Sequence, residues 1–532
     1  MNSQLDHSQR RVYTAKPITL GRSVGFGVLD LMGGGWNTII SGLMLYFFVT
    51  YGNITAVEAG TILFVARIVD AVVSLAIGPL TDNFYRTRLG KRFGRRHFFL
   101  MIGAPMLLLI FPLLWVSGQG FWYYLVVYLV IEIVMAMILI PWETLPTEMT
   151  DDYTARTKLS SARMFLSATG TFVVFFLPAQ IKASGNPNAF FITGLIFSVL
   201  FAGAVATTYF TTWERKLTPE FLAELEARPK VPVGRAVIDN FKDFGSTFTN
   251  SSFRKLLGIY LFSFTGKDIF ATALTFFIVY AIQGSESFGL TLQALSIVGL
   301  PVTILAGFLM VRRGPRFLWA LSFSVIIASL LALGAIYLFQ PSSTTALLVI
   351  VGITYQAGRS ILEFTPWNVF PFIPDVDRMM TGQDRAGIYA AVMTFGRKST
   401  GAIGTLVVSW LLDLGGFIKP GTAGGVQIDA TCTTSCPLEQ TPTAAHTIAM
   451  VVVLLPLVLI AIAFVISRFM YLTPATHQVL RAEIDRLEAG GARSDVTPQA
   501  REVAEKLTGH DYDTLWGRTA ATSALAEENR TR

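Results

Sequence analysis

Apolar stretches of roughly 20 residues recur along the chain between Phe26 and Leu472. Each is long enough to cross a hydrocarbon core of about 30 Å as an α-helix. Inside lipid such a stretch must be helical, because an unpaired backbone group finds no water there. The pattern predicts an all-α membrane protein with twelve transmembrane helices rather than a soluble enzyme. They are expected at residues 26–51, 57–81, 97–117, 121–146, 159–181, 189–212, 254–281, 289–311, 317–339, 345–370, 386–414 and 447–472.

Polar segments divide these helices into two pseudo-symmetric halves of six. The segment after the sixth helix is charged and contains Pro219, Pro229 and Pro232, which is typical of a connector, and we expect one short helix in it. The predicted parts are a cytoplasmic arm at 1–25, a first half at 26–212, a cytoplasmic connector at 213–253, a second half at 254–472 and a cytoplasmic tail at 473–532.

The tail is expected to be simple. Residues 477–489 carry apolar side chains at helical spacing and stop at Gly490, which predicts a surface helix. From Ser494 onward the polar composition predicts partial disorder. Neither segment contains a catalytic motif.

Basic residues concentrate in the loops on one side of the predicted membrane. The opposite loops contain Lys182 and Lys419 and almost no other basic residue. Because basic loops stay in the cytoplasm, both termini are predicted to be cytoplasmic and the protein to lie in the cell inner (plasma) membrane. The same bias accounts for the net charge of +7, so no nucleic-acid partner is implied. Residues 1–17 lack the apolar core of a signal peptide, and none is expected.

The composition narrows the functional classes. Only 14% of the residues are charged and 52% are hydrophobic, which is unlike a soluble domain. The two cysteines, Cys432 and Cys436, lie in one polar loop, where a local disulfide and two free thiols both remain open. Since there is no Cys/His cluster and no group of nucleophile and base, we expect neither a metal site nor an enzyme.

One short pattern, Pro-Trp-x3-Pro, occurs twice. It occupies residues 141–146 near the end of the fourth predicted helix and residues 366–371 near the end of the tenth. Acidic residues follow both copies, among them Glu148 and Asp375. These helices are equivalent members of the two halves, so the spacing indicates duplication of a six-helix unit. Substrate sites in such repeats lie near the membrane midplane between the halves.

The loop after the second helix contains Gly78, Asp82 and a basic run at 91–96. With its glycine, its aspartate and its paired basic residues, this loop resembles the hallmark of the major facilitator superfamily. The resemblance implies that the aspartate pairs with arginines or with a helix N-terminus and latches the cytoplasmic side. For the arginines, simple topogenic charge is the alternative. The expected gating residues are Asp82, Arg92, Arg95, Arg96, Glu148 and Asp375.

Ionisable residues also lie inside several predicted helices, where each needs a partner or a function because a charge is costly in the bilayer. Arg67 and Asp70 share a face of the second helix, with Ser74 one turn further. Arg359 and Glu363 are spaced to pair on the tenth. These charges predict a polar central cavity, and the alternative is that each pair only joins neighbouring helices. The others are Glu132, Glu143, Arg163, Lys267, Asp268, Arg397 and Lys398.

The run RIVDA at 67–71, followed by Gly78 and RTRLGK at 86–91, resembles the glycoside-pentoside-hexuronide:cation symporter family, typified by melibiose permease. The resemblance continues through the Pro-Trp pair and Arg163 to the Gly-Arg-Lys segment at 396–398. It implies that Asp70 and Arg67 belong to a cation site. It also implies that Trp142 and Arg163 lie near a sugar site, with Lys398 at or next to the family's lysine on helix 11.

The chain departs from this family at both sites. Ser74 stands where the family has a second carboxylate, and Val73 where it has an asparagine, so a sodium site built on those groups is lost. Proton coupling through Asp70 is therefore favoured over sodium coupling. The family's sugar-binding aspartates align with about Gly33 and Ile138. Nearby polar residues that could substitute are Asp30, Trp36, Asn37 and Glu132.

The sequence thus predicts a secondary transporter that imports a sugar or glycoside with H⁺ or Na⁺ and needs no other cofactor. A carrier of a lipid, steroid or other amphipathic solute and a membrane sensor remain alternatives. Expected partners are a small-molecule substrate and membrane lipid, and a monomer is sufficient for this architecture. The cation-coupling residues are expected to be Asp70, Arg67 and Ser74. The expected substrate-binding residues are Trp36, Asn37, Glu132, Trp142, Arg163, Lys267, Asp268, Trp367 and Lys398.

Overall fold

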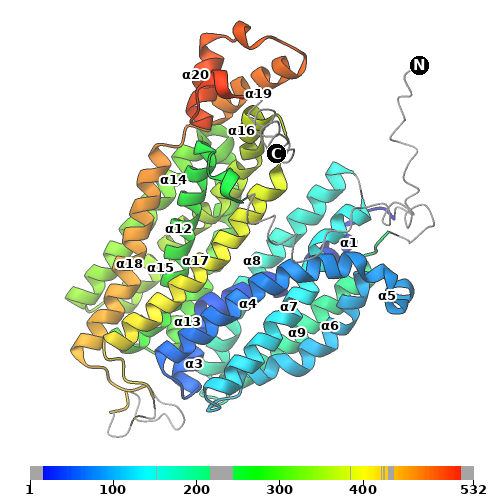
Figure 1. Cartoon of the computed structure of the whole chain (residues 1–532). Helices are drawn as coiled ribbons and strands as arrows, with labels where there is room; N and C mark the ends of the chain where they lie inside the picture. Colours follow the sequence, from blue (N-terminus) through cyan, green and yellow to red (C-terminus); the bar gives the residue numbers. More distant parts are fainter. Residues whose placement is uncertain are drawn as a thin grey trace, which may run out of the picture. The chain divides into compact units, whose positions relative to one another are not determined.

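The structure, a computed structural model, describes residues 16–150, 152–215, 244–383, 385–420, 422, 426–428 and 437–516. Over these residues the regular structure is helical, apart from one β-bridge between Gln427 and Leu438. The all-α prediction is therefore confirmed. The chain forms two compact units, whose helices can be followed by colour in Figure 1. One unit contains Met1–Ile39 and Val69–Val233, and the other contains Ile40–Ile68 and Gly234–Arg532.

The first unit is built from long helices joined by short connections. Its close packing depends on glycine: a Cβ added to Gly27 would lie 2.7 Å from the backbone carbon of Ala162, and one added to Gly34 would lie 2.1 Å from Ser167 Oγ. Small residues at these positions let the first helix approach α8 closely. The elements are α1 (Leu20–Gly27), α2 (Leu29–Ile39), the greater part of α4 (Ala56–Asn83), η2 (Phe84–Arg86), α5 (Arg88–Phe93), α6 (His97–Ile110), η3 (Phe111–Trp115), α7 (Phe121–Met149), α8 (Tyr153–Ala183) and α9 (Ala189–Thr211).

The second unit contains the remaining helices, of which α12 packs against α17 and α18, and α14 against α15. Two of its segments are single π-helical turns, η1 and η4. The elements are η1 (Ile40–Met44), α3 (Leu45–Tyr51), α12 (Ser251–Phe276), η4 (Phe277–Ala281), α13 (Glu286–Ala294), η5 (Leu295–Val298), α14 (Gly299–Phe339), α15 (Thr344–Val369), η6 (Phe370–Phe372), α16 (Ile373–Thr381), α17 (Ala386–Leu414), α18 (Pro442–Arg468), α19 (Pro474–Glu488), η7 (Arg493–Asp495), α20 (Pro498–Thr508) and η8 (Tyr512–Thr514).

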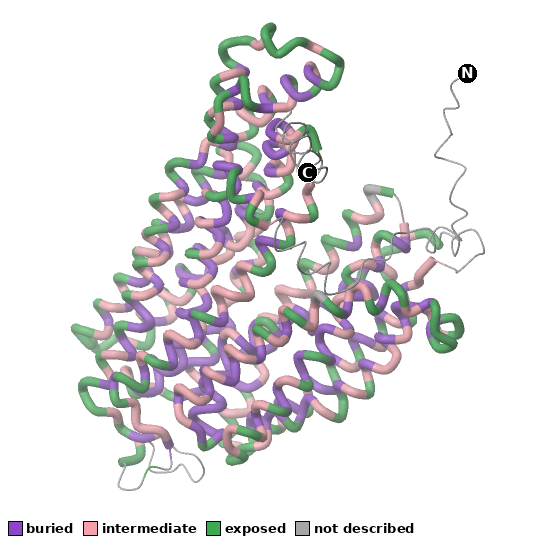
Figure 2. The backbone as a smooth tube through the Cα atoms, viewed as in Figure 1, coloured by how far each residue is buried: buried purple, intermediate pink, exposed green. Residues whose placement is uncertain are grey.

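Nine of the described helices are long and apolar enough to span a membrane. One of them, Glu286–Phe339, has 54 residues and is sharply broken at Gly314, which has φ of 75°, so it can make two passes. The helical segments at 20–51 and 386–414 are the other two predicted spans. The structure is thus compatible with the twelve predicted helices. Buried positions recur along every helix, with exposed positions between them (Figure 2).

Several helix ends differ from the prediction because capping residues extend the helices beyond the apolar run. The first helix begins at Leu20 instead of residue 26, since the Thr19 side chain accepts a hydrogen bond from Arg22 N. The last membrane helix begins at Pro442 instead of residue 447, where Thr441 caps it and Pro442 occupies the first turn. It also ends at Arg468, earlier than expected.

The tail is more ordered than predicted. The surface helix is confirmed as α19, but α20 forms where partial disorder was expected, and its Val503, Ala504 and Leu507 side chains are buried. The tail is held to the second unit by backbone contacts: Ser252 Oγ donates to Leu507 O at 2.6 Å, and Trp516 N donates to Met379 O at 3.1 Å. The prediction of disorder failed here because the buried apolar residues of α20 are few and widely spaced in a polar segment.

A buried acid stabilises the tail from within. Glu483 of α19 accepts hydrogen bonds from Arg486 at 2.6 Å and from the Tyr512 hydroxyl. Burial alone would raise the pKa of Glu483, but these hydrogen bonds and the charge of Arg486 bring the pKa below its usual value.

Some predictions fall outside the described residues. The short helix expected in the connector lies largely within residues 216–243, and Cys432 and Cys436 lie within 429–436, none of which is described. The predicted domain boundaries at 25, 212, 253 and 472 also stay predictions.

Candidate functional site

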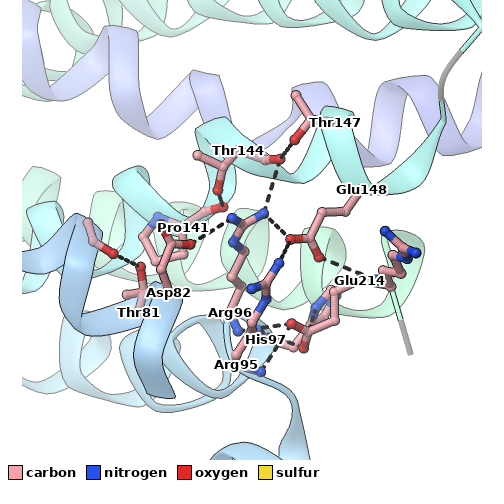
Figure 3. A network of polar contacts seen from close by, with 12 residues as sticks. Thr81, Asp82, Arg95, Arg96, His97, Pro141, Thr144, Thr147, Glu148 and Glu214 are labelled. Carbon is pink, nitrogen blue, oxygen red and sulfur yellow. Dashed lines mark hydrogen bonds and ion pairs between the residues drawn. The ribbon is translucent and has the colours of Figure 1, made fainter. Parts of the chain in front are cut away.

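Four residues predicted to act in gating form one network in the first unit (Figure 3). Arg95 and Arg96 precede α6, and both are buried and ion-paired with Glu148 near the end of α7. Arg96 Nη2 also lies 2.9 Å from Asp82 Oδ1 at the end of α4. Arg96 thus links α4 to α7, and the pairing predicted for Asp82 is confirmed. We call these four residues and Glu214 the Arg95–Arg96 network.

Glu214 joins this network, and sequence reasoning missed it. Its carboxylate accepts hydrogen bonds from the backbone N–H groups of Arg95 at 3.0 Å, Arg96 at 3.1 Å and His97 at 3.4 Å. These groups form the N-terminus of α6, where an anion is stabilised by the helix dipole. The signal available in the sequence was a single acid after Thr212, at the end of the sixth helix. In the folded chain this acid caps the third helix.

Two other predicted gating residues lie elsewhere. Arg92 is exposed, its guanidinium lies 5.1 Å from the ring centre of Phe93, and it makes no ion pair with a described acidic residue. Asp375 of α16 contacts the tail: its Oδ2 lies 2.7 Å from His477 Nε2 and its Oδ1 lies 3.0 Å from Arg481 Nη1. The structure therefore places neither of them in the Arg95–Arg96 network.

A second cluster in the first unit surrounds Arg163 of α8. Its guanidinium lies 2.8 Å from Asp30 Oδ2 of α2 and 2.9 Å from Glu143 Oε1 of α7. It also lies 4.5 Å from the ring centre of Trp142. The α8 cation is thus shared by two carboxylates at a point where three helices meet, and it remains partly exposed. Of the polar residues suggested as substitutes for the family's aspartates, Asp30 is the one in this cluster.

Three predicted substrate ligands are enclosed in this structure. Trp142, Trp36 and Glu132 are all buried, and Trp36 Nε1 donates to Glu132 Oε2 at 3.4 Å. These residues pack inside the interface between their own helices, and their contact with substrate stays a prediction. The hydropathy profile could not reveal this burial, since it does not show whether a given polar side chain points into a helix interface or away from it. Asn37 is exposed, and its side chain donates to Gly33 O at 3.0 Å.

The predicted cation-coupling residues lie along α4. Asp70 is buried, and Ser74 Oγ donates to its Oδ1 at 3.2 Å. Arg67 is partly buried one turn earlier on the same helix. The hydroxyl therefore supports the aspartate at the position where the resembling family has its second carboxylate.

The second unit holds a longer charge network, on α12, α15 and α17. Lys267 Nζ lies 2.8 Å from Glu363 Oε1, which Arg359 Nε approaches to 3.1 Å, so the predicted Arg359–Glu363 pair is confirmed. Arg397 Nη2 lies 2.6 Å from Asp268 Oδ2. We call these five residues the Lys267 network. It joins three helices and lies within segments that are predicted to be in the membrane.

Two more predicted substrate ligands flank the Lys267 network. Trp367 of α15 is 44% exposed and has its ring centre 5.7 Å from that of Tyr260. Lys398 follows Arg397 on α17 and is partly buried. The cations of the network lie near Phe264, with Lys267 at 4.8 Å and Arg397 at 5.2 Å from its ring centre.

A polar contact in the second unit escaped the sequence analysis. The Tyr51 hydroxyl, at the end of α3, donates to Glu286 Oε2 at the start of α13 at 2.7 Å, and both residues are buried. Nearby, Thr272 Oγ1 donates to Ser41 O at 2.6 Å. These bonds tie the end of the first transmembrane segment to helices more than 200 positions later. Nothing in the spacing of Tyr51 or Glu286 indicated this contact.

Within the described part of the chain no group of three or more His, Cys, Asp or Glu residues is arranged to hold a metal ion. The carboxylates described above contact arginine, lysine, histidine, serine, tyrosine or tryptophan side chains or, for Glu214, backbone N–H groups. Their observed chemistry is that of ion pairing and hydrogen bonding.

Comparison with known proteins identifies the group to which these features belong. Residues 25–474 match the family described as MFS/sugar transport protein. The chain is 25% identical over 476 residues to the uncharacterized symporter sll1374 of Synechocystis sp., covering 73% of this chain and 84% of that one. It is 23% identical to the glucuronide carrier protein homolog of Escherichia coli K12, covering 83% and 90%.

Among solved structures, a D-xylose–proton symporter matches with a TM-score of 0.54 and 15% identity, over 85% of this chain and 96% of that one. At this identity the likeness shows that the two proteins share a fold, and no more.

Proposed function

Because the chain belongs to the MFS/sugar transport protein family, we propose that it is a secondary active symporter that carries a sugar or glycoside across the inner membrane with a proton rather than sodium. Membership of the family makes it a multi-pass membrane transporter and not an enzyme. The names of its relatives include a symporter and a glucuronide carrier homolog, which supports sugar and cation symport in general.

The observation that carries the proposal is the pair of charge clusters inside membrane helices. Each charged group of the Arg163 cluster and of the Lys267 network has an ion-pair partner, although one cation serves two carboxylates in the first and three cations share two carboxylates in the second. Arg163, Glu143, Glu363 and Trp367 nevertheless keep exposed surface. A charge exposed to lipid is costly, so the exposed parts of these side chains fit a water-filled path. Hydroxyl-rich solutes are recognised by such paired charges together with an exposed aromatic ring.

Proton coupling is proposed for Asp70. One carboxylate and one serine hydroxyl on this face of α4 offer few oxygens for a sodium ion, whereas one proton neutralises the carboxylate completely. Neutral Asp70 would cross between conformations at a lower cost than the charged form. The cycle therefore needs the carboxyl group and not merely a polar side chain at this position.

Purified protein in liposomes tests this. We expect Asp70→Asn to abolish accumulation of substrate against its gradient while exchange of labelled for unlabelled substrate continues. Ser74→Ala is the matched control and should retain accumulation with altered pH dependence. Accumulation by Asp70→Asn, or accumulation driven by a sodium gradient without a pH gradient, would contradict proton coupling through Asp70.

A second candidate function is transport of an amphipathic solute. It is favoured by Ile138, which is fully buried against Gly103 at one position where the resembling family has a sugar-binding aspartate. Counterflow with sugars and amphipathic solutes in parallel decides between the two substrates.

The proposed orientation places both termini in the cytoplasm, with H⁺ as the coupling ion and the monomer as the functional unit. Thiol labelling of single cysteines introduced into the 182–188 loop and into α19, in a chain where Cys432 and Cys436 are replaced by serine, tests the orientation, since only the former should react from outside the cell.

A further inference from the structure

A cavity of about 530 Å³ opens in the first unit beside the Arg95–Arg96 network. Its walls come from α5, from the start of α6 and from the end of α9 with the residues that follow it. The lining includes Lys91, Phe93, Tyr209, Phe210, Trp213 and Arg215. Both the mechanism proposed above and the gating network leave this cavity without a function.

The cavity has a surplus of positive charge. The segment 86–92 carries Arg86, Arg88, Lys91 and Arg92, and none of them forms an ion pair with a described acidic residue. The acid in the described lining, Glu214, is already engaged by the backbone N–H groups that begin α6. Lys91 at the wall therefore has no anionic partner within the described chain.

The opposite side of the cavity is aromatic. Phe210 is 81% exposed at the end of α9, and Trp213 lies between Lys16 at 5.8 Å and Arg22 at 5.5 Å from its ring centre. The Trp213 indole N–H has no hydrogen-bond partner among the described residues. An aromatic side chain with a polar edge is the type found where a membrane meets water.

An apolar surface continues from the cavity along α9. The exposed residues of this helix include Phe191, Leu195, Val199 and Leu200 as well as Phe210. A basic cavity that opens onto an exposed apolar helix face matches a ligand with a phosphate at one end and acyl chains at the other.

We propose that this cavity binds the headgroup of an anionic glycerophospholipid of the cytoplasmic leaflet, with its phosphate near Lys91 and Arg215 and its chains along α9. The positive-inside bias explains why basic residues lie on this side, but it requires neither the cavity nor the aromatic wall. The site is separate from the Arg163 cluster and from the Lys267 network. Because Glu214 and Arg95 line it, the lipid lies directly against the Arg95–Arg96 network.

Native mass spectrometry of the purified full chain, titrated with phosphatidylglycerol, phosphatidylcholine or inorganic phosphate, tests the site. We expect one tightly retained phosphatidylglycerol and weaker binding of phosphatidylcholine. Lys91→Gln with Arg215→Gln should weaken the retained lipid about fivefold for each charge removed. Lys91→Arg keeps the charge and should keep the binding.

A matched control removes two charges elsewhere: Arg312→Gln with Arg313→Gln, in α14 immediately before its break at Gly314. An equal loss of phosphatidylglycerol in this control, or unchanged binding in the Lys91 and Arg215 double variant, would overturn the proposal. Release of the lipid by millimolar inorganic phosphate would also overturn it, because a simple anion site would then be sufficient.

Discussion

The two copies of the Pro-Trp-x3-Pro pattern share both prolines and the tryptophan but differ in environment. Trp142 is completely buried: it stacks on Phe26, donates to Phe26 O at 3.0 Å and is covered by the Arg163 guanidinium. Trp367 is 44% exposed and touches Tyr260 only by an edge-to-face contact. In the second unit the arginine and lysine lie over Phe264, so one face of Trp367 stays open.

The acids that follow the two copies differ as well. Glu148 is buried between Arg95 and Arg96 of the same unit's second loop, while Asp375 is partly exposed and is held by His477 and Arg481 of the tail. The comparison teaches that a duplicated pattern preserves the backbone plan but not the use of its side chains. The first copy stabilises a helix interface, and the second leaves an aromatic ring and a tail contact accessible.

The largest expected effect of breaking this asymmetry is that of Glu148→Gln. Removing the carboxylate breaks the ion pairs of Glu148 with the buried Arg95 and Arg96 guanidinium groups, while the Arg96–Asp82 pair remains. Breaking a buried pair costs about 3–5 kcal/mol of unfolding free energy. Denaturant unfolding in detergent micelles measures it. Glu148→Asp is the control and should lose less, and a loss for Glu148→Gln under about 1 kcal/mol would show that the two arginines find other partners.

An intermediate effect is expected for Trp367→Ala. If its open face stacks on the substrate, the variant should raise KM about fivefold, corresponding to one aromatic contact, with little change in unfolding free energy. Trp142→Phe is the matched comparison in the other copy. It should leave KM unchanged and lower the unfolding free energy by about 1 kcal/mol, because the hydrogen bond to Phe26 O is lost. A raised KM for Trp142→Phe together with an unchanged KM for Trp367→Ala would contradict this comparison.

The smallest effect is expected for Asp375→Asn. Its ion pairs with His477 and Arg481 are partly exposed, and such pairs contribute about 0–1 kcal/mol. The visible consequence should be local: faster proteolysis of the segment from α19 to α20, with transport largely retained. If Asp375→Asn lowered the unfolding free energy as much as Glu148→Gln, the two acids would have the same structural importance.

The sequence allowed much of the fold and part of the site to be predicted. The length of the apolar stretches predicted the membrane helices. The four-residue spacing of Arg359 and Glu363 predicted an ion pair that forms within one helix. The Asp82–Arg96 pair followed from a family resemblance. Contacts such as Glu214 with the start of α6, or Tyr51 with Glu286, were not predictable, because they depend on which helix packs against which.

The burial of Trp142 escaped prediction for a related reason. The sequence around Trp142 does not show whether a neighbouring helix covers its side chain. The residues that cover it, Phe26 and Arg163, lie far away in sequence. The order of α20 was missed because its stability comes from packing on α12 and α16 rather than from its own apolar content.

The π-helical turn at Ile40–Met44 sets the angular phase of everything that follows it in the first transmembrane segment. Such a turn contains one residue more than the α-helical turn it replaces. If the same residues were wound as a regular α-helix, the segment that follows them would be rotated by about 100°, one residue's share of a turn. Tyr51 would then point away from Glu286. One extra residue in the backbone, rather than the identity of any side chain, thus determines where this helix can be fastened.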